Sequence, residues 1–460
     1  MPLIESFSGI RGIWNHGLDI DVCIGYAYLF RKFLENKNAH SIQKVVIARD
    51  TRHSSNEISD AITQVFDEVI DIGIATTPMA EHAVRAFKAS GGIMITASHN
   101  EPEWNGLKFL DDDGAVLRIN DIHGIIAEYQ KIKNKDIRMP KRKAKSTNIF
   151  NYNKEIISEY ADFVRSTIGK DTIKSIIGTD AKFLLDANGG AGIKNLEVLK
   201  QLGIRHDAIN TKESVFPRRI EPNENSLAYL KEIIREKNLA LAFGFDCDAD
   251  RAEVVFSDGV INGHYLLALA VDFVLSKSKN PSKETIVIND ATSGIVSYAA
   301  KKFNAKLIET DVGEINVVEE MLRQKSIIGG EGSSSGVILR PSRCRDGLLT
   351  SLIILGILAE KGKPIRNIIA EYPQYTTLRN DLKIEINNID KFKERIAGYY
   401  KKKKLNVKKS EAIKVFLDDN SFVWFRMSKT ENNLLRIIAD SHERKKAESA
   451  MAEAISLVNG

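Results

Sequence analysis

Short apolar runs alternate with stretches of helical period along the first part of the chain. The pattern predicts strands over residues 45–48, 70–74 and 92–96 and helices over 57–69 and 79–88. Strands that alternate with helices are typical of a layered α/β fold. A lysine-rich stretch of poor periodicity, 131–146, predicts a linker that closes this first unit near residue 145.

The alternation of predicted strands and helices recurs in two further segments. A second unit is predicted from a strand at 182–186, a glycine-rich turn at 188–192, a helix at 193–202 and a strand at 240–245. A third begins near Gly259 with a helix to Leu275 and continues through strands at 285–289, 306–309 and 326–328 to a helix at 347–361. Three successive units of similar size therefore share one α/β organisation.

The last part of the chain has a different pattern. Strand-like runs at 382–386, 414–417, 422–426 and 435–439 precede a closing helix at 443–458, which predicts an α+β domain. We therefore predict four domains, at residues 1–145, 146–256, 257–370 and 371–460.

Composition narrows the class of protein. Of the 460 residues, 43% are hydrophobic and 28% charged, and no apolar run approaches the roughly 20 residues of a membrane span. The net charge of +5 is small for this length and disfavours a nucleic-acid binder. Because the N-terminus lacks a secretory pattern, we expect a cytoplasmic protein. Cys23, Cys247 and Cys344 are isolated, which predicts reduced thiols rather than disulfides or a zinc site.

Three carboxylates alternate at the end of the strand predicted at 240–245. Alternate residues of an extended segment point the same way, so Asp246, Asp248 and Asp250 can converge on one point. Converging carboxylates normally need a hard cation, and oxygen ligands without histidine favour Mg²⁺. The alternative is an acidic loop that caps the next element.

A serine follows the strand predicted at 92–96. Ser98 is succeeded by His99 and Asn100, and Lys108 lies further along the same segment. One interpretation is the N-cap of a following helix. The other is a nucleophile or phosphoserine, which together with the three aspartates would form a metal-assisted site for phosphoryl transfer.

Several segments resemble, in order, the loops of the α-D-phosphohexomutase superfamily. Residues 96–100 with 105–108 resemble its phosphoserine loop, 246–251 its metal loop with Cys247 where glycine is usual, 330–336 its sugar loop, and 426–431 with Arg436 its phosphate loop. Residues 7–12 and 49–52 also fit the opening pattern of that family. The resemblance therefore extends over nearly the whole chain.

The resemblance implies a fold and a reaction. The fold would be α/β, with three related α/β domains of mixed sheets and a C-terminal α+β domain around a central cleft. The reaction would be reversible phosphoryl transfer between the 1- and 6-positions of a hexose phosphate, through phosphoserine and a bisphosphorylated sugar. It implies one Mg²⁺ per chain, a hexose 1,6-bisphosphate as activator, a small-molecule sugar phosphate as partner without nucleic acid or membrane, and a monomer or homodimer.

The resemblance also assigns roles to residues. The implied catalytic residues are Ser98, His99, Lys108, Arg11 and Arg251; the metal ligands are Ser98, Asp246, Asp248 and Asp250; the substrate-binding residues are Glu331, Ser333, Ser335 and Arg345; and the phosphate-binding residues are Arg426, Ser428, Lys429, Thr430 and Arg436.

The sequence departs from the family pattern in the sugar loop. Many members carry a histidine there, where this chain has only serines, Ser333 to Ser335. This loop and residues 310–317 resemble phosphoglucosamine mutases more closely, with a phosphomannomutase/phosphoglucomutase of relaxed specificity as the alternative. Cys247, Lys429 and Asn432 also motivate a non-catalytic sugar-phosphate sensor, and a Mg²⁺-dependent seryl-phosphate phosphatase is a further alternative.

Overall fold

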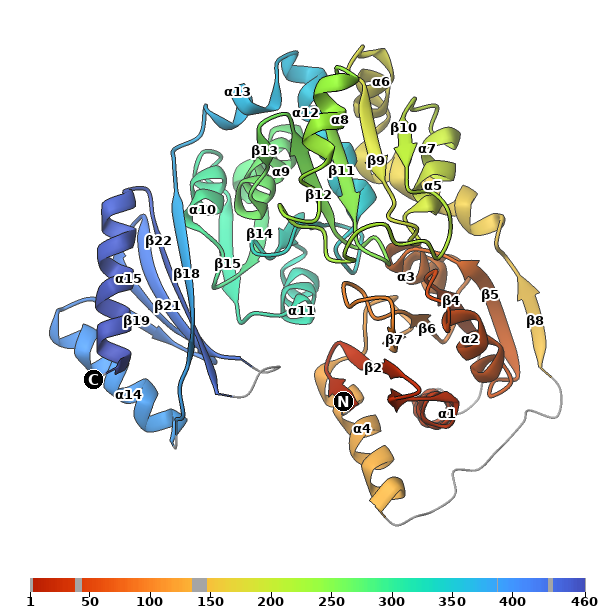
Figure 1. Cartoon of the computed structure of the whole chain (residues 1–460). Helices are drawn as coiled ribbons and strands as arrows, with labels where there is room; N and C mark the ends of the chain where they lie inside the picture. Colours follow the sequence, from red (N-terminus) through yellow and green to blue (C-terminus); the bar gives the residue numbers. More distant parts are fainter. Residues whose placement is uncertain (1–2, 38–43, 135–146, 387, 429–432, 460) are drawn as a thin grey trace. The chain divides into compact units, whose positions relative to one another are not determined.

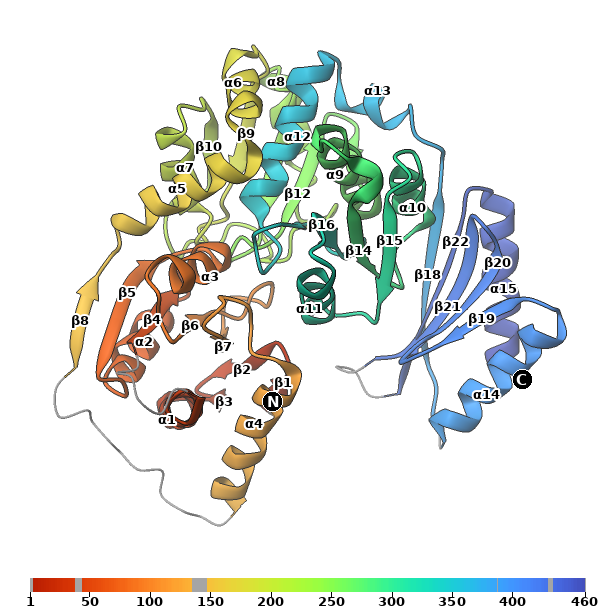
Figure 2. The ribbon, with the colours of Figure 1, turned by 180° about the vertical axis from the view of Figure 1, so that it is seen from behind.

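The computed structural model describes residues 3–37, 44–134, 147–386, 388–428 and 433–459, which Figures 1 and 2 show from opposite sides. The chain forms two compact units. Unit 1 comprises Met1–Ile261 and Ser335–Gly362, and unit 2 comprises Asn262–Ser334 and Lys363–Gly460. The boundaries of the four domains stay a prediction.

The first sheet of unit 1 is mixed. Its strands are β1 (Ile4–Ser6), β2 (Gly9–Trp14), β3 (Gly17–Leu18), β4 (Lys44–Arg49), β5 (Glu68–Ile74), β6 (Gly91–Ile95), β7 (Trp104–Leu110) and β8 (Asn148–Asn151). The order is β1-β2-β7-β6-β4-β5-β8, with β3 beside β2. Strands β4, β5, β6 and β8 are parallel, whereas β7 runs antiparallel to both β6 and β2.

Four helices accompany this sheet (Figure 1). Helices α1 (Ile20–Lys37), α2 (Ser55–Thr63) and α4 (Ile119–Asn134) contribute apolar side chains to one core with the strands, whereas α3 (Thr77–Ala86) packs against β4 and β6. The helix predicted at 57–69 was too long, because residues 68–74 pair with β4 and β8 as β5. The linker predicted at 131–146 was partly wrong, since α4 extends to Asn134; residues 135–146 lie outside the described residues.

The second sheet of unit 1 contains β9 (Phe183–Asp186), β10 (Asp207–Ile209), β11 (Leu241–Phe245), β12 (Ala252–Phe256) and β13 (Gly259–Val260). Its order is β10-β9-β11-β12-β13, parallel through β11 and antiparallel beyond it. Its helices are α5 (Glu155–Ile168), α6 (Lys170–Gly178), α7 (Ile193–Gln201), α8 (Leu230–Glu236) and α12 (Gly347–Lys361), and β17 (Val337–Leu339) precedes α12. Helix α12 comes from the later segment of unit 1 and packs against α5, α6 and β12.

Unit 2 begins with an α/β part. Strand β14 (Thr285–Asn289) pairs in parallel with β15 (Lys306–Thr310) and β16 (Ile328–Gly330). The helices are α9 (Gly263–Lys277), the 3₁₀ helix η1 (Pro281–Lys283), α10 (Gly294–Lys301) and α11 (Glu314–Gln324). The strand predicted at 285–289 is confirmed, but the third helical stretch begins at Gly263 because Gly259–Val260 forms β13.

The end of the chain forms an antiparallel sheet in the order β18-β22-β21-β20-β19, which confirms the predicted α+β part. Its elements are α13 (Ile365–Ile369), β18 (Thr376–Lys383), α14 (Ile389–Lys402), β19 (Asn406–Lys409), β20 (Ile413–Asp418), β21 (Ser421–Met427), β22 (Leu434–Ser441) and α15 (Arg444–Asn459). Helices α14 and α15 cover one face of this sheet (Figure 2). The sequence pattern missed the short lysine-containing strand β19 and also α14, whose lysines mask a narrow apolar face formed by Phe392, Ile396 and Tyr400.

Within the described ranges, no helix is long and apolar enough to cross a membrane. The apolar helices α9 and α12 have 15 residues each. At 1.5 Å per residue that is about 22 Å, short of the roughly 30 Å hydrocarbon layer. Cys23, Cys247 and Cys344 are buried free thiols.

Candidate active site

Ser98 lies in the loop between β6 and β7, where the chain turns sharply. Its φ of 51° is in the left-handed region, and its backbone N–H donates to Oγ1 of Thr96 at 2.8 Å. The hydroxyl Oγ lies 3.3 Å from Oδ2 of Asp246 and 3.4 Å from Nδ1 of His99. The next regular element is a strand, β7, so the N-cap interpretation of Ser98 is wrong.

Arg52 stabilises the loop that carries Ser98. Its guanidinium donates to the carbonyl oxygens of Ser98 (2.8 Å), Asn100 (2.6 Å), Glu101 (2.6 Å) and Trp104 (3.0 Å). Asp50 accepts from Nε of Arg52 at 3.0 Å, and both side chains are fully buried. A planar guanidinium can bond several carbonyl groups at once, and the backbone around Ser98 is therefore fixed.

The three aspartates come together in the loop after β11. Asp246, Asp248 and Asp250 are buried, and one ligand oxygen of each lies within 4.8 Å of the others. The glycine-rich turn of residues 188–192 supports this loop, since the N–H of Ala191 donates to the carbonyl of Cys247 at 2.7 Å. A Cβ on Gly190 would lie 2.7 Å from the same carbonyl oxygen, so this close approach needs glycine.

The unsatisfied atoms of this cluster fit a divalent cation. Oδ1 of Asp248 and Oδ1 of Asp250 are buried, and no described residue donates a hydrogen bond to either. Burial, and then the carboxylates of Asp250 and Asp248, raises the pKa of Asp246 well above its usual value. A cation bound to these oxygens would satisfy the orphaned atoms and displace that proton. The oxygen-only donor set suits Mg²⁺, with the three aspartates and Oγ of Ser98 as the residues that would hold it.

Cationic side chains surround the same point. Nζ of Lys108 lies 2.7 Å from Oδ2 of Asp248, and although burial opposes its charge, Asp248 and Asp250 raise the pKa of Lys108. Nε of Arg251 lies 3.9 Å from both Asp246 and Asp250. Nη1 of Arg11 donates to Oδ1 of Asn100 at 3.4 Å. Nε of Arg11 is buried without a hydrogen-bond acceptor among the described residues, which leaves a donor for an anion, whereas Nε of Arg251 already faces two carboxylates.

His99 is neutral in this environment. Burial, followed by the charges of Arg251 and Arg11, lowers the pKa of His99 to about 2. The imidazole of His99 is therefore uncharged and a weak base, whereas the ammonium of Lys108 keeps its proton and can donate hydrogen bonds.

Two of the predicted substrate-binding residues lie in unit 1. Arg345 is largely buried, and its Nη2 donates to Oδ2 of Asp250 at 3.0 Å. Ser335 is buried and donates its hydroxyl to Glu253, a carboxyl whose pKa burial raises to about 7. Arg345 thus contacts the acidic cluster directly.

The other two lie in unit 2. Oε1 of Glu331, directly after β16, accepts from Nδ2 of Asn289 at 2.8 Å and from the N–H of Gly313 at 2.9 Å. Asn289 ends β14 and Gly313 follows β15, so polar groups at the carboxyl ends of three parallel strands meet, which is where α/β sheets bind ligands. Ser333 is exposed on the same loop.

The predicted phosphate-binding residues lie on β21 and β22. Arg426 and Arg436 are direct partners in the antiparallel ladder, and Nε of Arg426 is buried without a hydrogen-bond acceptor among the described residues. Like charges opposite each other destabilise a sheet, and here each arginine is partly compensated by a carboxylate: Nη2 of Arg426 lies 3.5 Å from Glu411 and Nε of Arg436 lies 3.7 Å from Asp381. Ser428 follows β21, and its N–H donates to the carbonyl of Leu434 at 2.7 Å. Lys429 and Thr430 lie outside the described residues.

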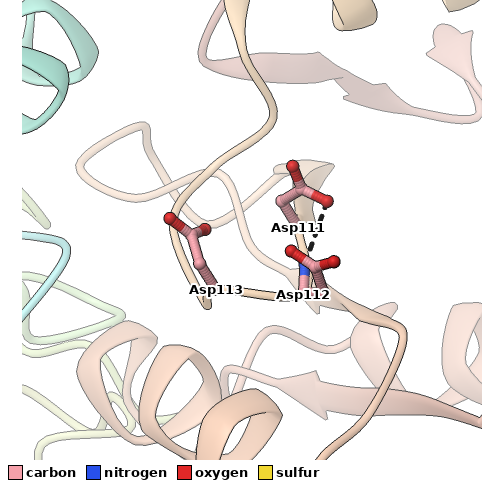
Figure 3. Close-up of side chains that lie close together, drawn as sticks. All are labelled: Asp111, Asp112 and Asp113. Carbon is pink, nitrogen blue, oxygen red and sulfur yellow. Dashed lines mark hydrogen bonds between the residues drawn. The ribbon is translucent and has the colours of Figure 1, made fainter. Parts of the chain in front are cut away.

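A second acidic cluster, Asp111 to Asp113 in unit 1, contrasts with the first (Figure 3). Nζ of Lys37 pairs with Asp111 at 2.5 Å and with Asp112 at 3.2 Å, and Nη2 of Arg118 pairs with Asp113 at 2.7 Å. The N–H of Asp112 also donates to Oδ1 of Asp111 at 2.9 Å. Neighbouring cations and turn amides therefore neutralise these carboxylates, and the cluster has a structural explanation.

The sequence analysis gave no role to some residues that contact the predicted catalytic and sugar-binding residues. Thr77 donates its hydroxyl to Oδ2 of Asp248 at 2.6 Å from the first turn of α3. Arg52 appeared in a matched motif without a role, and Asn289 is a polar residue at a strand end. The strand-end position of Asn289 was a usable signal, but nothing local in the sequence indicates the contact of Thr77.

Comparison with known proteins agrees with this geometry. The sequence matches the family Phosphoglucomutase/phosphomannomutase through its alpha/beta/alpha domain I over residues 5–136, domain II over 158–259 and domain III over 262–375. A Phosphoglucomutase/phosphomannomutase of Thermococcus kodakarensis is 30% identical, over 98% of this chain and 97% of its own. A phosphoglucosamine mutase of Clostridium botulinum is 32% identical over 80% of this chain and 81% of its own.

Solved structures share the fold. A Phosphoglucomutase/phosphomannomutase family protein of Burkholderia thailandensis matches with a TM-score of 0.79 at 20% identity, over 100% of this chain and 98% of its own. The N-acetylphosphoglucosamine mutase of Aspergillus fumigatus, solved with GlcNAc-6P and magnesium, matches with a TM-score of 0.58 at 14% identity, over 100% of this chain and 96% of its own. With the matched domains and the relative that spans the full length, these likenesses show that the chain belongs to the phosphoglucomutase/phosphomannomutase family of the α-D-phosphohexomutase superfamily and is an isomerase of that class.

Proposed function

We propose that this phosphohexomutase interconverts the 6- and 1-phosphates of glucosamine, with Ser98 as phosphoryl donor and acceptor. One Mg²⁺ per chain would bind at Asp246, Asp248 and Asp250, and a hexose 1,6-bisphosphate would prime Ser98. The enzyme would act in the cytoplasm as a monomer or homodimer.

One observation carries the chemical part of the proposal. The hydroxyl of Ser98 lies 3.3 Å from Asp246, the first of three buried carboxylates, and Nε of Arg251 lies 3.9 Å from the same carboxylate. A serine that only caps or packs would not need this arrangement. A phosphorylated Ser98 would find both a cation site and anion-binding arginines around it.

Different residues would take different parts in the phosphoryl transfer. The sugar hydroxyl oxygen forms a bond to phosphorus while the bond from phosphorus to Oγ of Ser98 breaks. The sugar hydroxyl loses its proton and Oγ gains one, so no proton is consumed overall; His99, whose Nδ1 lies 3.4 Å from Oγ, and Lys108 are the candidates for these transfers. Lys108, Arg11 and Arg251 stabilise the negative charge of the moving group. When bound, Mg²⁺ supplies further positive charge to the phosphoryl oxygens.

The predicted sugar and phosphate loops supply recognition in this proposal. Glu331, fixed by Asn289 and Gly313, and exposed Ser333 would bind sugar hydroxyls. Arg426, Ser428 and Arg436, with Lys429 and Thr430, would bind the phosphate that does not react.

The choice of sugar rests on the serine-rich loop and on the relatives. The relative from Clostridium botulinum is named a phosphoglucosamine mutase, whereas that from Thermococcus kodakarensis is named for glucose and mannose phosphates. A phosphomannomutase/phosphoglucomutase is therefore the second candidate.

A substrate panel on wild type and Ser98→Ala tests both parts. We expect glucosamine 6-phosphate to give the highest kcat/KM in wild type, and Ser98→Ala to lose turnover by at least about 10³-fold because it removes the nucleophile. Preference for mannose or glucose phosphates would contradict only the sugar. Release of inorganic phosphate faster than isomerisation would indicate a phosphatase, and no phosphate on Ser98 with no turnover would indicate a sensor.

A further inference from the structure

Asp248 and Asp250, the last two aspartates of the acidic loop, each accept hydrogen bonds through one carboxylate oxygen. Oδ2 of Asp248 accepts from the hydroxyl of Thr77 at 2.6 Å and from Nζ of Lys108 at 2.7 Å. Oδ2 of Asp250 accepts from Nη2 of Arg345 at 3.0 Å. The second oxygen of each, Oδ1, receives no hydrogen bond from the described residues. Oδ2 is therefore the hydrogen-bonded oxygen of both carboxylates, while Oδ1 of Asp248 accepts no such bond and Oδ1 of Asp250 lies 3.9 Å from Nε of Arg251.

Thr77 is rigidly placed for this contact. It is the first residue of α3, and its backbone N–H donates to the carbonyl oxygen of Asp248 at 3.0 Å. Its side chain is only 1% exposed, and the hydroxyl of Thr76 caps the helix through the N–H of Met79. Thr77 thus binds both the backbone and the side chain of Asp248, which fixes the direction of that carboxylate.

Arg345 is fixed through the segment around it. The carbonyl of Ser335 accepts from the N–H of Ala252, after the acidic loop, at 2.8 Å, and the N–H of Gly347 donates to the carbonyl of Ala249 at 3.3 Å. A Cβ on Gly347 would lie 2.7 Å from that carbonyl oxygen, so the approach is close. The segment from Ser335 to Gly347 therefore contacts the acidic loop on both sides of Asp250 and aims Arg345 at its carboxylate.

We propose that Thr77 and Arg345 are positioning residues that restrict Asp248 and Asp250 to one ligand oxygen each. A carboxylate whose Oδ2 already accepts hydrogen bonds cannot turn to bind a cation with both of its oxygens. Ca²⁺ takes six to eight oxygen ligands and often uses bidentate carboxylates, whereas Mg²⁺ demands a compact octahedron of single oxygens. The two contacts therefore select the smaller ion, an inference that rests on the proposed cation site at the aspartates.

The affinity ratio of Mg²⁺ to Ca²⁺ tests this proposal without reference to turnover. Mn²⁺ bound to the full-length protein is measured by electron paramagnetic resonance, and Mg²⁺ and Ca²⁺ are titrated in as competitors. Loss of the charge of Arg345 strengthens the binding of both ions alike, so the ratio is more informative than either affinity. Partners of metal ligands typically change metal affinity by about 10–100-fold.

We expect Thr77→Val and Arg345→Met each to lower the ratio of Mg²⁺ to Ca²⁺ affinity about tenfold, with Thr77→Ser restoring it. Thr172→Val and Arg31→Met are matched controls, because both residues are largely buried in unit 1 away from the acidic loop, and we expect the wild-type ratio. Thermal unfolding shows whether each variant is folded. If Arg345→Met does not fold, the comparison of Thr77→Val with Thr77→Ser decides.

The failure of this inference differs from the failure of the proposed function. A folded variant whose ratio equals that of wild type overturns the assignment of that residue while the cation site stands. If Thr77→Ser behaves as Thr77→Val, the hydroxyl is not the selecting group. If wild type binds none of the three ions, the cation site itself is wrong and the inference falls with it.

Discussion

Arg52 donates a hydrogen bond of 2.8 Å from Nη2 to the backbone carbonyl oxygen of Ser98. The same guanidinium donates to three further carbonyl groups of the loop that carries Ser98, the proposed nucleophile. The side chain of Ser98 owes its direction to a φ of 51°, a conformation uncommon for a residue other than glycine. The arginine thus maintains the backbone geometry that presents the hydroxyl.

We predict that Arg52→Lys lowers kcat by about 100-fold, because a misplacement of the nucleophile of about 1 Å has effects of that size. An ammonium keeps the charge but cannot bond four carbonyl groups in one plane. Steady-state kinetics, with KM and kcat separated, measure the effect. Arg31→Lys, another largely buried arginine that contacts a carbonyl and a carboxylate, serves as control. An unchanged kcat in a folded Arg52→Lys would refute this role.

Gly106 allows β7 to pass close to its neighbours. A Cβ there would lie 2.3 Å from the carbonyl oxygen of Ile10 on β2 and 2.9 Å from that of Thr96. We predict that Gly106→Ala lowers the free energy of unfolding by about 1–3 kcal/mol, as overpacking generally does. Urea denaturation measures this. Gly124→Ala, where a Cβ would meet no atom within 4 Å, should show no such loss.

His82 makes stability depend on pH. It lies on α3 against the ring of Phe163, with centroids 4.5 Å apart, and burial, followed by the charge of Arg85, lowers its pKa to about 4. Above pH 6.5 neither the folded nor the unfolded histidine is charged, so its contribution is complete. As the pH falls from 6.5 to 4, the unfolded state binds the proton first, and stability is lost by up to about 3 kcal/mol.

We therefore predict that His82→Phe flattens the pH dependence of the unfolding free energy between pH 4 and 6.5. Chemical denaturation at several pH values measures the slope. His123→Phe, on α4, whose histidine is exposed, is the control. An equal slope in wild type and His82→Phe would show that another group causes the acid dependence.

Glu331 should affect recognition rather than folding. In Glu331→Gln the amide oxygen can still accept from Asn289 and Gly313, but the negative charge offered to sugar hydroxyls is lost. We predict a KM for the hexose phosphate raised about tenfold, the order expected for one weakened hydrogen bond to a charged group. Kinetics and thermal unfolding check the two expectations. The exposed substitution Glu236→Gln should alter neither.

Local pattern was sufficient for much of the fold. The strand at 285–289 and the helix at 347–361 agree residue for residue with β14 and α12, since each is a strongly apolar segment with clear ends. The boundary between α2 and β5 was wrong because helical period continues past Thr63. Pairing of Glu68 with Lys44 and Asn148 decides that boundary, and pairing is not visible locally.

For the candidate site too, local pattern was informative and long-range contacts were not visible. The cluster of three aspartates could be predicted because Asp246, Asp248 and Asp250 alternate within one short segment, and the structure brings their oxygens together. The contact of Thr77 could not be predicted, because its partner Asp248 is 171 residues away and the contact exists only after two sheets of unit 1 have packed together. Arg345 was predicted to bind the sugar, but its Nη2 donates to Asp250, a contact that depends on how the segment from Ser335 returns to unit 1.

That return of the chain affects how the protein is made. Helix α12 packs against α5, α6 and β12, yet 73 residues of unit 2, from Asn262 to Ser334, are synthesised before it. A nascent chain that ends at Ile261 leaves open the apolar surface that α12 covers. Unit 1 therefore cannot be completed on the ribosome until Gly362 has emerged, and no single uninterrupted stretch of the gene encodes it.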